Sequence, residues 1–369
     1  MKKILLMSLL VILLIGLVIG GCAAPAPSTT SKPSTDTKPA AAQPIELKFS
    51  SGSPFTVGMG KNIYVPWIAK IEEQTAAIGK PVKFTTFPQE ALGKFNDQYD
   101  LVVKGVADVD GPWGPMHFPG RMPLLESLQL PCLFPSSAIA CQVAHELVNA
   151  RPEIQKEVGE AKLLFFNTTP PAGISVRGKQ IKTLEDFKGL KISSRPGMAN
   201  FIIQSLGGTP VPMSPTDAYQ ALERGVIDGV IMNWDGTLTF KYMDVTKYRT
   251  ATPFSLWCDP LACSMNLNTW NKLPPEVQKI IEQNSGLAQS KIAGEIFDKT
   301  QAGILNVIKQ ADQKAGNPDI YTITDNEFKN WLTAMNPLYD KWIADVSAKG
   351  LPGKAVYDTL RSITNKYVK

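Results

Sequence analysis

One ten-residue pattern occurs twice in this chain, and it limits the folds that the chain can adopt more than any other feature. Residues 99–108 and 219–228 share tyrosine, glycine, valine and aspartate at identical spacing. Each copy is typical of a helix that ends at a glycine and is followed by a short apolar strand. Two similar α/β lobes are the simplest explanation, although a helix–glycine–strand turn is common enough to recur by chance.

A tryptophan follows each copy within a few residues, Trp113 after the first and Trp234 after the second. Open α/β sheets bind ligands at the carboxyl ends of their strands, so we expect both loops to face a cleft between the lobes. We expect Trp257, near a later strand end, to face it as well. Aromatic faces there would enclose an apolar or planar ligand, although each tryptophan could instead be a packing residue of the core.

The N-terminus has the layout of a bacterial export signal. Lys2 and Lys3 precede an apolar run from Ile4 to Ile19, too short for a comfortable membrane span, and two glycines lead from it to Cys22. The string Ile-Gly-Gly-Cys resembles a lipobox, in which a diacylglycerol alkylates the Cys22 thiol; an ordinary cleaved signal with an incidental cysteine is the alternative. Of the 21 residues at 23–43, 17 are Ala, Pro, Ser or Thr, a composition that stays extended and solvated. We therefore expect an exported protein, anchored by a lipid to the outer face of the cytoplasmic membrane or located in the periplasm.

Other apolar patterns also indicate an α/β protein. Residues 45–49 are apolar at alternate positions, as in a half-buried strand, and a helical stripe at 64–71 leads to a second extended run at 82–84. Strand, helix and strand in succession favour a parallel sheet. Apolar residues at 328–343 recur at helical spacing and are assigned to the core. The expected segments are a signal peptide at 1–21, a tether at 22–43, lobe 1 at 44–166, lobe 2 at 167–252, and a return segment with C-terminal helices packing on both lobes at 253–369.

Charge and motif content argue against several function classes. A net charge of +5 is too weak and too dispersed to indicate nucleic-acid binding. The sequence has no Gly-x-Ser-x-Gly elbow, no phosphate-binding loop and no Gly-x-Gly-x-x-Gly, and its two histidines form no metal-binding pattern. It therefore gives no signal for catalysis, a cofactor or a metal site. Cys132, Cys141, Cys258 and Cys263 are compatible with disulfides in an exported protein or with buried free thiols.

Several short strings elsewhere follow one another in a fixed order. They are Gly-Leu-Lys-Ile at 189–192, Gly-Gly-Thr-Pro-Val-Pro-Met at 207–213, Ala-Tyr-Gln-Ala-Leu at 218–222 and Val-Ile-Asp-Gly at 226–229, with flanking matches at 105–108, 118–121, 181–188, 268–270 and 273–276. In this order they resemble the solute receptors of tripartite ATP-independent periplasmic (TRAP) transporters, of the dicarboxylate-receptor type. The resemblance covers nearly the whole body of the chain.

The resemblance implies a two-lobed α/β fold like that of periplasmic binding proteins. Such a receptor closes its cleft on a small organic anion and delivers it to the small and large subunits of a membrane permease, without catalysis. A binding module that feeds a signalling receptor is the alternative, and a secreted α/β hydrolase is the weaker one, since a fold alone does not decide function.

The resemblance also implies an anion anchor. Receptors of this type carry an arginine two residues after the lysine of the Gly-Leu-Lys string, where this chain has Ser193. Arg195 follows two residues later, where we expect a strand to end and Pro196 to start a helix whose backbone amides favour an anion. We expect Arg195 to bind the ligand carboxylate, with a solvated or structural arginine as the alternative.

Two further positions depart from the family pattern. A second arginine that many relatives carry is absent, with Gly173 near its place and Arg177 four residues later. Asn233 lies one residue beyond the position where relatives carry an asparagine near the ligand, so its amide is a candidate ligand contact. Losing one arginine and shifting the other weakens the case for a C4-dicarboxylate and favours a monocarboxylate or an aromatic acid.

Overall fold

The computed structural model describes residues 43–194 and 197–368. Its contacts divide the chain into residues 1–41 and 42–369, and all the elements below belong to the second unit, the body. The signal, Cys22 and the tether up to residue 42 lie outside the described residues, and so does Arg195.

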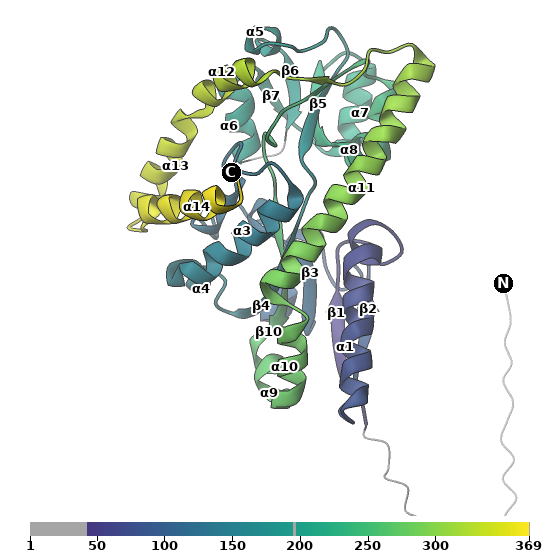
Figure 1. The fold of residues 1–369 in the computed structure, drawn as a ribbon, viewed down its shortest axis with the longest axis vertical. Helices are drawn as coiled ribbons and strands as arrows, with labels where there is room; N and C mark the ends of the chain where they lie inside the picture. The colour runs from purple at the N-terminus through teal and green to yellow at the C-terminus, as the bar shows by residue number, and fades with distance from the viewer. Residues whose placement is uncertain (1–42, 195–196, 369) are drawn as a thin grey trace, which may run out of the picture. The chain divides into compact units, whose positions relative to one another are not determined.

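The body contains two mixed sheets, each with helices packed on its faces (Figure 1). Lobe 1 is the part built on the sheet with strand order β2-β1-β3-β10-β4. In it β1 is parallel to β2 and β3, whereas β10 is antiparallel to β3 and β4. Its strands are β1 (Ile45–Ser50), β2 (Val82–Phe87), β3 (Val109–Trp113), β4 (Ala161–Thr168) and β10 (Pro260–Asn266).

Lobe 2 is the part built on the sheet with strand order β11-β9-β5-β8-β6-β7. Here β6 is parallel to β7 and β8, and β5 is antiparallel to β8 and β9. Its strands are β5 (Ala172–Val176), β6 (Lys191–Ser194), β7 (Thr209–Pro212), β8 (Gly229–Asn233), β9 (Tyr248–Ala251) and β11 (Tyr321–Thr322). The two-lobed α/β fold is confirmed. The sheets are mixed because β5 and β10, the first strands after the chain crosses from one lobe to the other, run antiparallel to the strands beside them.

The first strand, helix and strand lie where the sequence predicts them. A π-helical turn at Gly60–Tyr64 continues into α1 (Val65–Ala77), whose buried face includes Trp67 and Ile71. These side chains pack in one core cluster with Leu47 of β1, so the helical stripe and the alternating strand bury the same surface.

The repeated sequence pattern forms the same turn in both lobes. It joins α2 (Gln98–Val103) to β3 and α7 (Pro215–Glu223) to β8. Gly105 and Gly225 both have positive φ, 70° and 72°, a conformation that glycine adopts without steric strain. The prediction of two similar α/β units is therefore confirmed at the level of backbone conformation.

The long helix α11 (Gly286–Ala315) is fixed to both lobes. At the start of α3 (Ser137–Ala150), the backbone N–H groups of Ser137 and Ala138 donate to the two carboxylate oxygens of Asp298, at 2.8 and 3.0 Å. Near the other end of α11, Asp312 forms a fully buried ion pair of 2.6 Å with Arg249 of β9. α11 therefore links the two lobes and is hydrogen-bonded to each of them.

The C-terminal helices divide between the lobes, and their apolar stripe is buried as predicted. Trp331 of α12 (Asp325–Met335) belongs to the core of lobe 2, whereas Trp342 of α13 (Pro337–Ser347) and Leu360 of α14 (Gly353–Tyr367) belong to a core cluster of lobe 1. No helix within residues 43–194 and 197–368 is long and apolar enough to cross a membrane.

The remaining helices are α4 (Pro152–Glu157), α5 (Leu184–Phe187), α6 (Met198–Ser205), α8 (Trp234–Thr239), α9 (Leu267–Lys272) and α10 (Pro275–Gln283), with short 3₁₀ turns at Phe95–Asp97, Pro115–His117, Leu125–Gln129 and Tyr242–Asp244.

Candidate functional site

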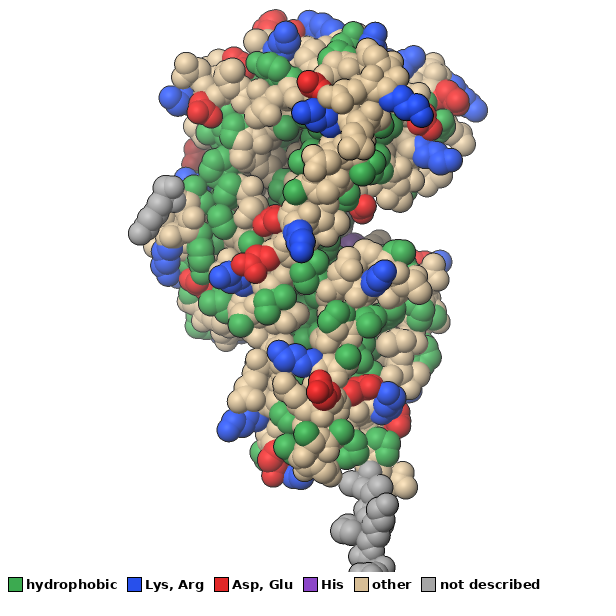
Figure 2. Space-filling view, turned by 45° about the vertical axis from the view of Figure 1, so that its right-hand side comes forward, with side chains coloured by type: hydrophobic (Ala, Val, Ile, Leu, Met, Phe, Trp, Pro, Cys, Tyr) green, Lys and Arg blue, Asp and Glu red, His purple; other side chains and the backbone are tan. Residues whose placement is uncertain are grey.

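A cleft of about 720 Å³ lies where the two lobes meet. Figure 2 shows the body hollowed between its upper and lower parts. Most of the described lining side chains are apolar, which is typical of a ligand site for a small molecule with a hydrophobic part. Lobe 1 contributes Ser53, Met59, Phe95, Asn96, Pro112, Met116, His117, Pro119, Gln129 and Leu261, lobe 2 contributes Met198 and Ala199, and the crossing segments contribute Thr169, Trp257 and Asp259.

The two segments that cross between the lobes, 169–171 and 252–259, are hydrogen-bonded to each other through residues that line the cleft. The Thr169 N–H donates to the Asp259 carbonyl, and the Asp259 N–H donates to Thr169 Oγ1, both at 3.3 Å. The Thr168 hydroxyl also donates to the Asp259 carbonyl at 3.2 Å. The two crossing segments thus form a short hinge that is held together by hydrogen bonds. Some of its side chains line the cleft.

Trp257 is the sequence-predicted site residue that the described structure places in the cleft wall. Its indole is half-buried and also borders a small adjoining hollow next to Ser193 and Met213 at the end of the lobe 2 sheet. The indole N–H donates to Asp259 Oδ2 at 3.1 Å. The ring is therefore held at the boundary between the cleft and the strand ends of lobe 2.

His117 and Phe95 form an aromatic pair on the lobe 1 side of the cleft. Their ring centroids are 4.6 Å apart. His117 Nδ1 accepts the Gly114 N–H at 3.0 Å, so a neutral ring carries its proton on Nε2. Together with Met59 and Met116 these rings give lobe 1 an apolar wall with polarisable sulfur atoms, which adapt well to an aromatic ligand.

The structure places Trp113 in the core of lobe 1. Its side chain is fully buried, its ring lies 4.6 Å from that of Tyr99, and its indole N–H donates to Ser264 Oγ at 2.9 Å. Its neighbour Pro112, not Trp113, lines the cleft. Packing against Tyr99 accounts for this position.

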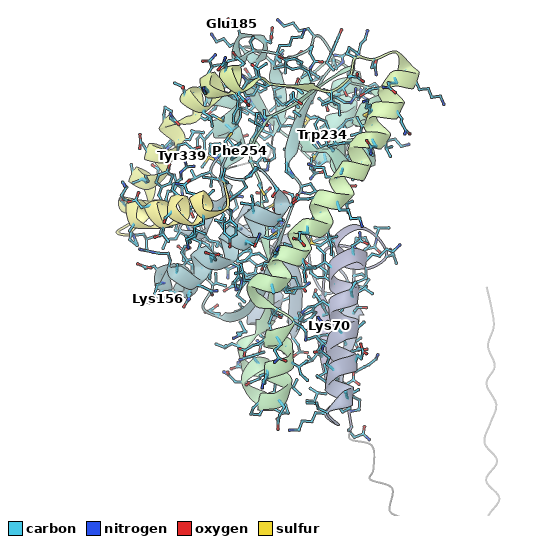
Figure 3. All side chains as sticks on the ribbon, in the orientation of Figure 1. Lys70, Lys156, Glu185, Trp234, Phe254 and Tyr339 are labelled. Carbon is cyan, nitrogen blue, oxygen red and sulfur yellow. The ribbon has the colours of Figure 1, made fainter. Side chains whose placement is uncertain are left out.

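Trp234 is also buried, with 3 % of its surface exposed, at the first turn of α8 and close to α11 (Figure 3). A Cβ atom on Gly173 would lie 2.1 Å from Trp234 Cζ2, so the indole occupies the space that a side chain at position 173 would need. The second arginine of the family pattern is absent near position 173 in this chain. The Trp234 ring fills the space there, so no residue larger than glycine fits at position 173. Trp234 borders a separate hollow of about 500 Å³ beside Leu305 and Lys309 of α11.

Asn233 and Arg177 are not among the described residues that line the cleft. Asn233 caps α8, because its side-chain oxygen accepts the Gly236 N–H at 2.6 Å. Arg177 is exposed at the end of β5 and borders a different hollow, next to Asp312. Arg195 is not among the described residues, but Ser194 before it ends β6, and Met198 shortly after it lines the cleft.

No lysine or arginine occurs among the described residues that line the cleft, and Asp259 is the acidic group there. Sequence reasoning missed Asp259 and the methionines of the wall. The available signal was the string Trp-Cys-Asp-Pro at 257–260, which places an acid two residues from a tryptophan on an extended segment. Methionines carry no such signal, because they are equally common in cores.

The cysteines and acidic residues indicate no reactive or metal centre in the described part of the chain. Cys132, Cys141, Cys258 and Cys263 are buried free thiols, and burial raises the pKa of Cys258 to about 12. Such thiols are poor nucleophiles because the reactive form is the thiolate. Among residues 43–194 and 197–368, no group of three or more His, Cys, Asp or Glu side chains is arranged to hold a metal ion.

Comparisons with known proteins agree on one family. The sequence profile of the family described as "Bacterial extracellular solute-binding protein, family 7" matches residues 60–345. The outer membrane transporter protein TsaT of Comamonas testosteroni is 24 % identical over 312 residues, covering 82 % of this chain and 87 % of the relative. The C4-dicarboxylate-binding periplasmic protein DctP of Rhodobacter capsulatus is 22 % identical over 322 residues, covering 84 % and 90 %.

Two solved structures are similar over almost the whole body. A marine metagenome TRAP solute-binding protein specific for aromatic acid ligands, in complex with metahydroxyphenylacetate, is 26 % identical with a TM-score of 0.77, covering 88 % of this chain and 100 % of that one. A TRAP solute-binding protein of Rhodoferax ferrireducens with copurified benzoate is 25 % identical with a TM-score of 0.76, covering 88 % and 98 %.

Proposed function

This chain belongs to family 7 of the bacterial extracellular solute-binding proteins, and from that premise we propose that it is the solute receptor of a TRAP transporter. It works outside the cytoplasm, binds a small organic anion in the cleft between its lobes and delivers it to the small and large membrane subunits of the permease. The two lobes and the short hydrogen-bonded hinge between them suit a protein that closes on its ligand.

The observation that carries the ligand assignment is the composition of the cleft wall. Its described residues include Trp257, Phe95 and Met198 and no lysine or arginine, so a ligand with two or more carboxylates would leave negative charge without a partner. We therefore assign one carboxylate to Arg195 and the rest of the ligand to the apolar wall. Two similar receptors with aromatic acids bound, metahydroxyphenylacetate and benzoate, support an aromatic monocarboxylate.

Arg195 is proposed as the anion anchor because of the elements that come before and after it in the chain. Ser194 ends β6, and α6 begins at Met198, so the intervening residues join a strand end to a helix start. An arginine offers a planar pair of donors that matches a carboxylate. Arg177, Asn233, Trp113 and Trp234 are secondary candidates, since none of them is among the described residues that line the cleft.

Binding measurements on the mature chain test this function. Calorimetry should give a micromolar Kd for benzoate, about −8 kcal/mol, and weaker binding of succinate. Arg195→Ala should weaken benzoate binding at least about 30-fold, because it removes the charge partner of a desolvated carboxylate. Arg224→Ala, which removes an exposed arginine at the end of α7, is the matched control and should leave the Kd unchanged. Unchanged binding in Arg195→Ala would refute the anchor, and tighter binding of succinate than of benzoate would refute the ligand class.

We also propose that Cys22 carries the lipid that anchors the receptor. The lipobox-like string and the Ala/Pro/Ser/Thr tether support this, and tethering raises the effective concentration of receptor near its permease. Mass spectrometry of the N-terminal peptide should show a diacylglyceryl mass on Cys22, and Cys22→Ala should release the protein from washed membranes. An unmodified N-terminus would leave an ordinary export signal as the explanation.

A further inference from the structure

Asp259 is a nearly buried acid, 6 % exposed, in the wall of a cleft that we assign to an anion. A carboxylate offers no attraction to a negatively charged ligand, so its place in the cleft wall calls for another role. Its hydrogen bonds supply one, because they connect it to two other residues of the cleft wall.

Both carboxylate oxygens of Asp259 accept side-chain donors from residues that line the cleft. Gln129 Nε2 of lobe 1 donates to Oδ1 at 2.9 Å, and Trp257 Nε1 donates to Oδ2 at 3.1 Å. A charged acceptor makes these hydrogen bonds stronger than neutral ones. The indole of Trp257 is thus held by its N–H, and the residue borders both the cleft and the adjoining hollow.

The backbone on both sides of this pair is fixed as well. Asp259 is hydrogen-bonded through its N–H and its carbonyl to the other crossing segment at Thr169. The Trp257 carbonyl accepts the hydroxyl of Ser255, which itself accepts the Ala172 N–H at 3.1 Å. An aromatic side chain with its backbone and its N–H both held has little freedom left to lose when a ligand arrives, which is the general advantage of a preorganised site.

We propose that Asp259 is a positioning residue that holds the Trp257 indole as the planar wall of the cleft, so that the receptor selects carboxylates that carry an aromatic ring. The inference rests on the proposed function and adds the residue that sets its ligand preference. Asp259 acts through Trp257 and contributes no attraction of its own for the anion. Selectivity between a flat and a non-flat acid, rather than affinity alone, is therefore the property that it controls.

The test compares benzoate with cyclohexanecarboxylate, an acid of similar size and equal charge without a flat ring. Asp259→Asn keeps the shape but replaces one acceptor by a donor that opposes either Trp257 or Gln129. Removing the negative charge affects both acids alike, so the ratio of their two Kd values isolates the effect on the ring. We expect the preference of the wild type for benzoate to fall about three- to ten-fold, the range of an aromatic pair contact, and the near-UV circular dichroism of tryptophan to change.

Trp257→Leu and the double variant show whether Asp259 acts through the indole. Trp257→Leu should lose the benzoate preference at least as fully, and Asp259→Asn should lower it no further in the Trp257→Leu background. Glu223→Gln removes an exposed charge from α7 and should leave the ratio unchanged. If Asp259→Asn does not fold, Gln129→Met removes the opposite donor to the same carboxylate and should reduce the preference in the same direction.

Two outcomes overturn the inference: an unchanged Kd ratio in a folded Asp259→Asn variant, or additive losses in the double variant. If Gln129→Met is measured in place of Asp259→Asn, an unchanged ratio of the two Kd values in that variant also overturns the inference. A wild-type receptor that binds neither acid contradicts the proposed function instead, so the two failures are distinguishable.

Discussion

In lobe 1 the glycine turn at Gly105 follows α2, and in lobe 2 the glycine turn at Gly225 follows α7. The backbone hydrogen bonds within the two turns correspond to one another. Val106 N–H donates to Leu101 O at 2.9 Å, and Val226 N–H donates to Ala221 O at 2.8 Å. The aspartate three residues after each glycine accepts the backbone N–H of a lysine on the neighbouring strand at 2.8 Å, Asp108 from Lys48 and Asp228 from Lys191.

The same positions differ in what surrounds them. Tyr99 is 2 % exposed, lies against Trp113 and donates its hydroxyl to Val158 O at 3.2 Å, whereas its counterpart Tyr219 is only half-buried at the edge of a small cluster. Two residues beyond each aspartate, lobe 1 has the buried acid Asp110 and lobe 2 has Val230. The turn is thus a local property, while the burial of each residue depends on the rest of the lobe.

The largest expected difference between the copies is at the tyrosine. Tyr99→Ala should lower the free energy of unfolding by about 3–5 kcal/mol, because it leaves a cavity beside Trp113 and removes the buried hydrogen bond from the Tyr99 hydroxyl to Val158 O. Tyr219→Ala should lower it by about 1 kcal/mol, as for a partly exposed side chain. Urea unfolding followed by circular dichroism measures both. Equal losses would show that the two lobes bury their turns to the same extent.

Asp110 should give lobe 1 a pH dependence that Val230 does not give lobe 2. Burial raises the pKa of Asp110 well above its ordinary value, against hydrogen bonds from the Ser264 N–H and hydroxyl to Oδ1. The folded state therefore holds a proton that the unfolded chain releases at about pH 4. Its stabilising effect is complete below that pH and is lost as the pH rises through the folded pKa, with a slope of at most about 1.4 kcal/mol per pH unit.

Asp110→Asn removes this titration while keeping the shape of the side chain. Unfolding at a series of pH values from 4 to 8 should show the wild type losing stability relative to the variant as the pH rises. Parallel pH profiles for the two proteins would mean that Asp110 keeps an ordinary pKa in the folded state.

The glycines themselves should respond alike in the two lobes. Gly105→Ala and Gly225→Ala place a Cβ at positive φ, which costs about 1–2 kcal/mol in either turn. A Cβ on Gly225 would also lie 2.7 Å from Nη1 of Arg177, but that is the end of an exposed, flexible side chain that can move away. Denaturant midpoints should therefore fall by similar amounts. A much larger loss for Gly225→Ala that Arg177→Ala relieves would show that the arginine is held in place.

The smallest expected difference is at the aspartates. Asp108 uses both carboxylate oxygens, since Oδ1 also accepts the Thr269 hydroxyl at 2.7 Å, whereas among the described residues Asp228 uses Oδ2 alone. Asparagine keeps one acceptor, so Asp108→Asn should cost about 1 kcal/mol and Asp228→Asn about 0.5 kcal/mol or less. Thermal unfolding of the two variants side by side resolves this difference, and a reversed order would contradict the assignment of the second hydrogen bond.

Much of the fold was predictable because it depends on local patterns. The repeated turn, the first strand, helix and strand, and the apolar stripe of the C-terminal helices follow from residue spacing and from the need for glycine at positive φ. The order of the strands was not predictable in the same way. β10 pairs with β3 and β4 after the chain has passed through lobe 2, and no local signal marks a pairing over such a distance.

The candidate site was less predictable than the fold. Three tryptophans at or near strand ends are equivalent in sequence, yet Trp257 lines the cleft, Trp113 packs against Tyr99 and Trp234 covers Gly173. A tryptophan suits either environment, so its own neighbours in the chain do not distinguish them. Asp259 is likewise understood only from its partners, because Gln129 is 130 residues away in the chain.

The sequence by itself thus determined the two matching turns, the α/β class and the family resemblance, since each is written in the order and spacing of a few residues. Only the tertiary structure decided which aromatic ring faces the cleft and which acid holds it. Backbone conformation at a turn depends on neighbouring residues, whereas burial and side-chain hydrogen bonds depend on groups that meet only when distant segments pack.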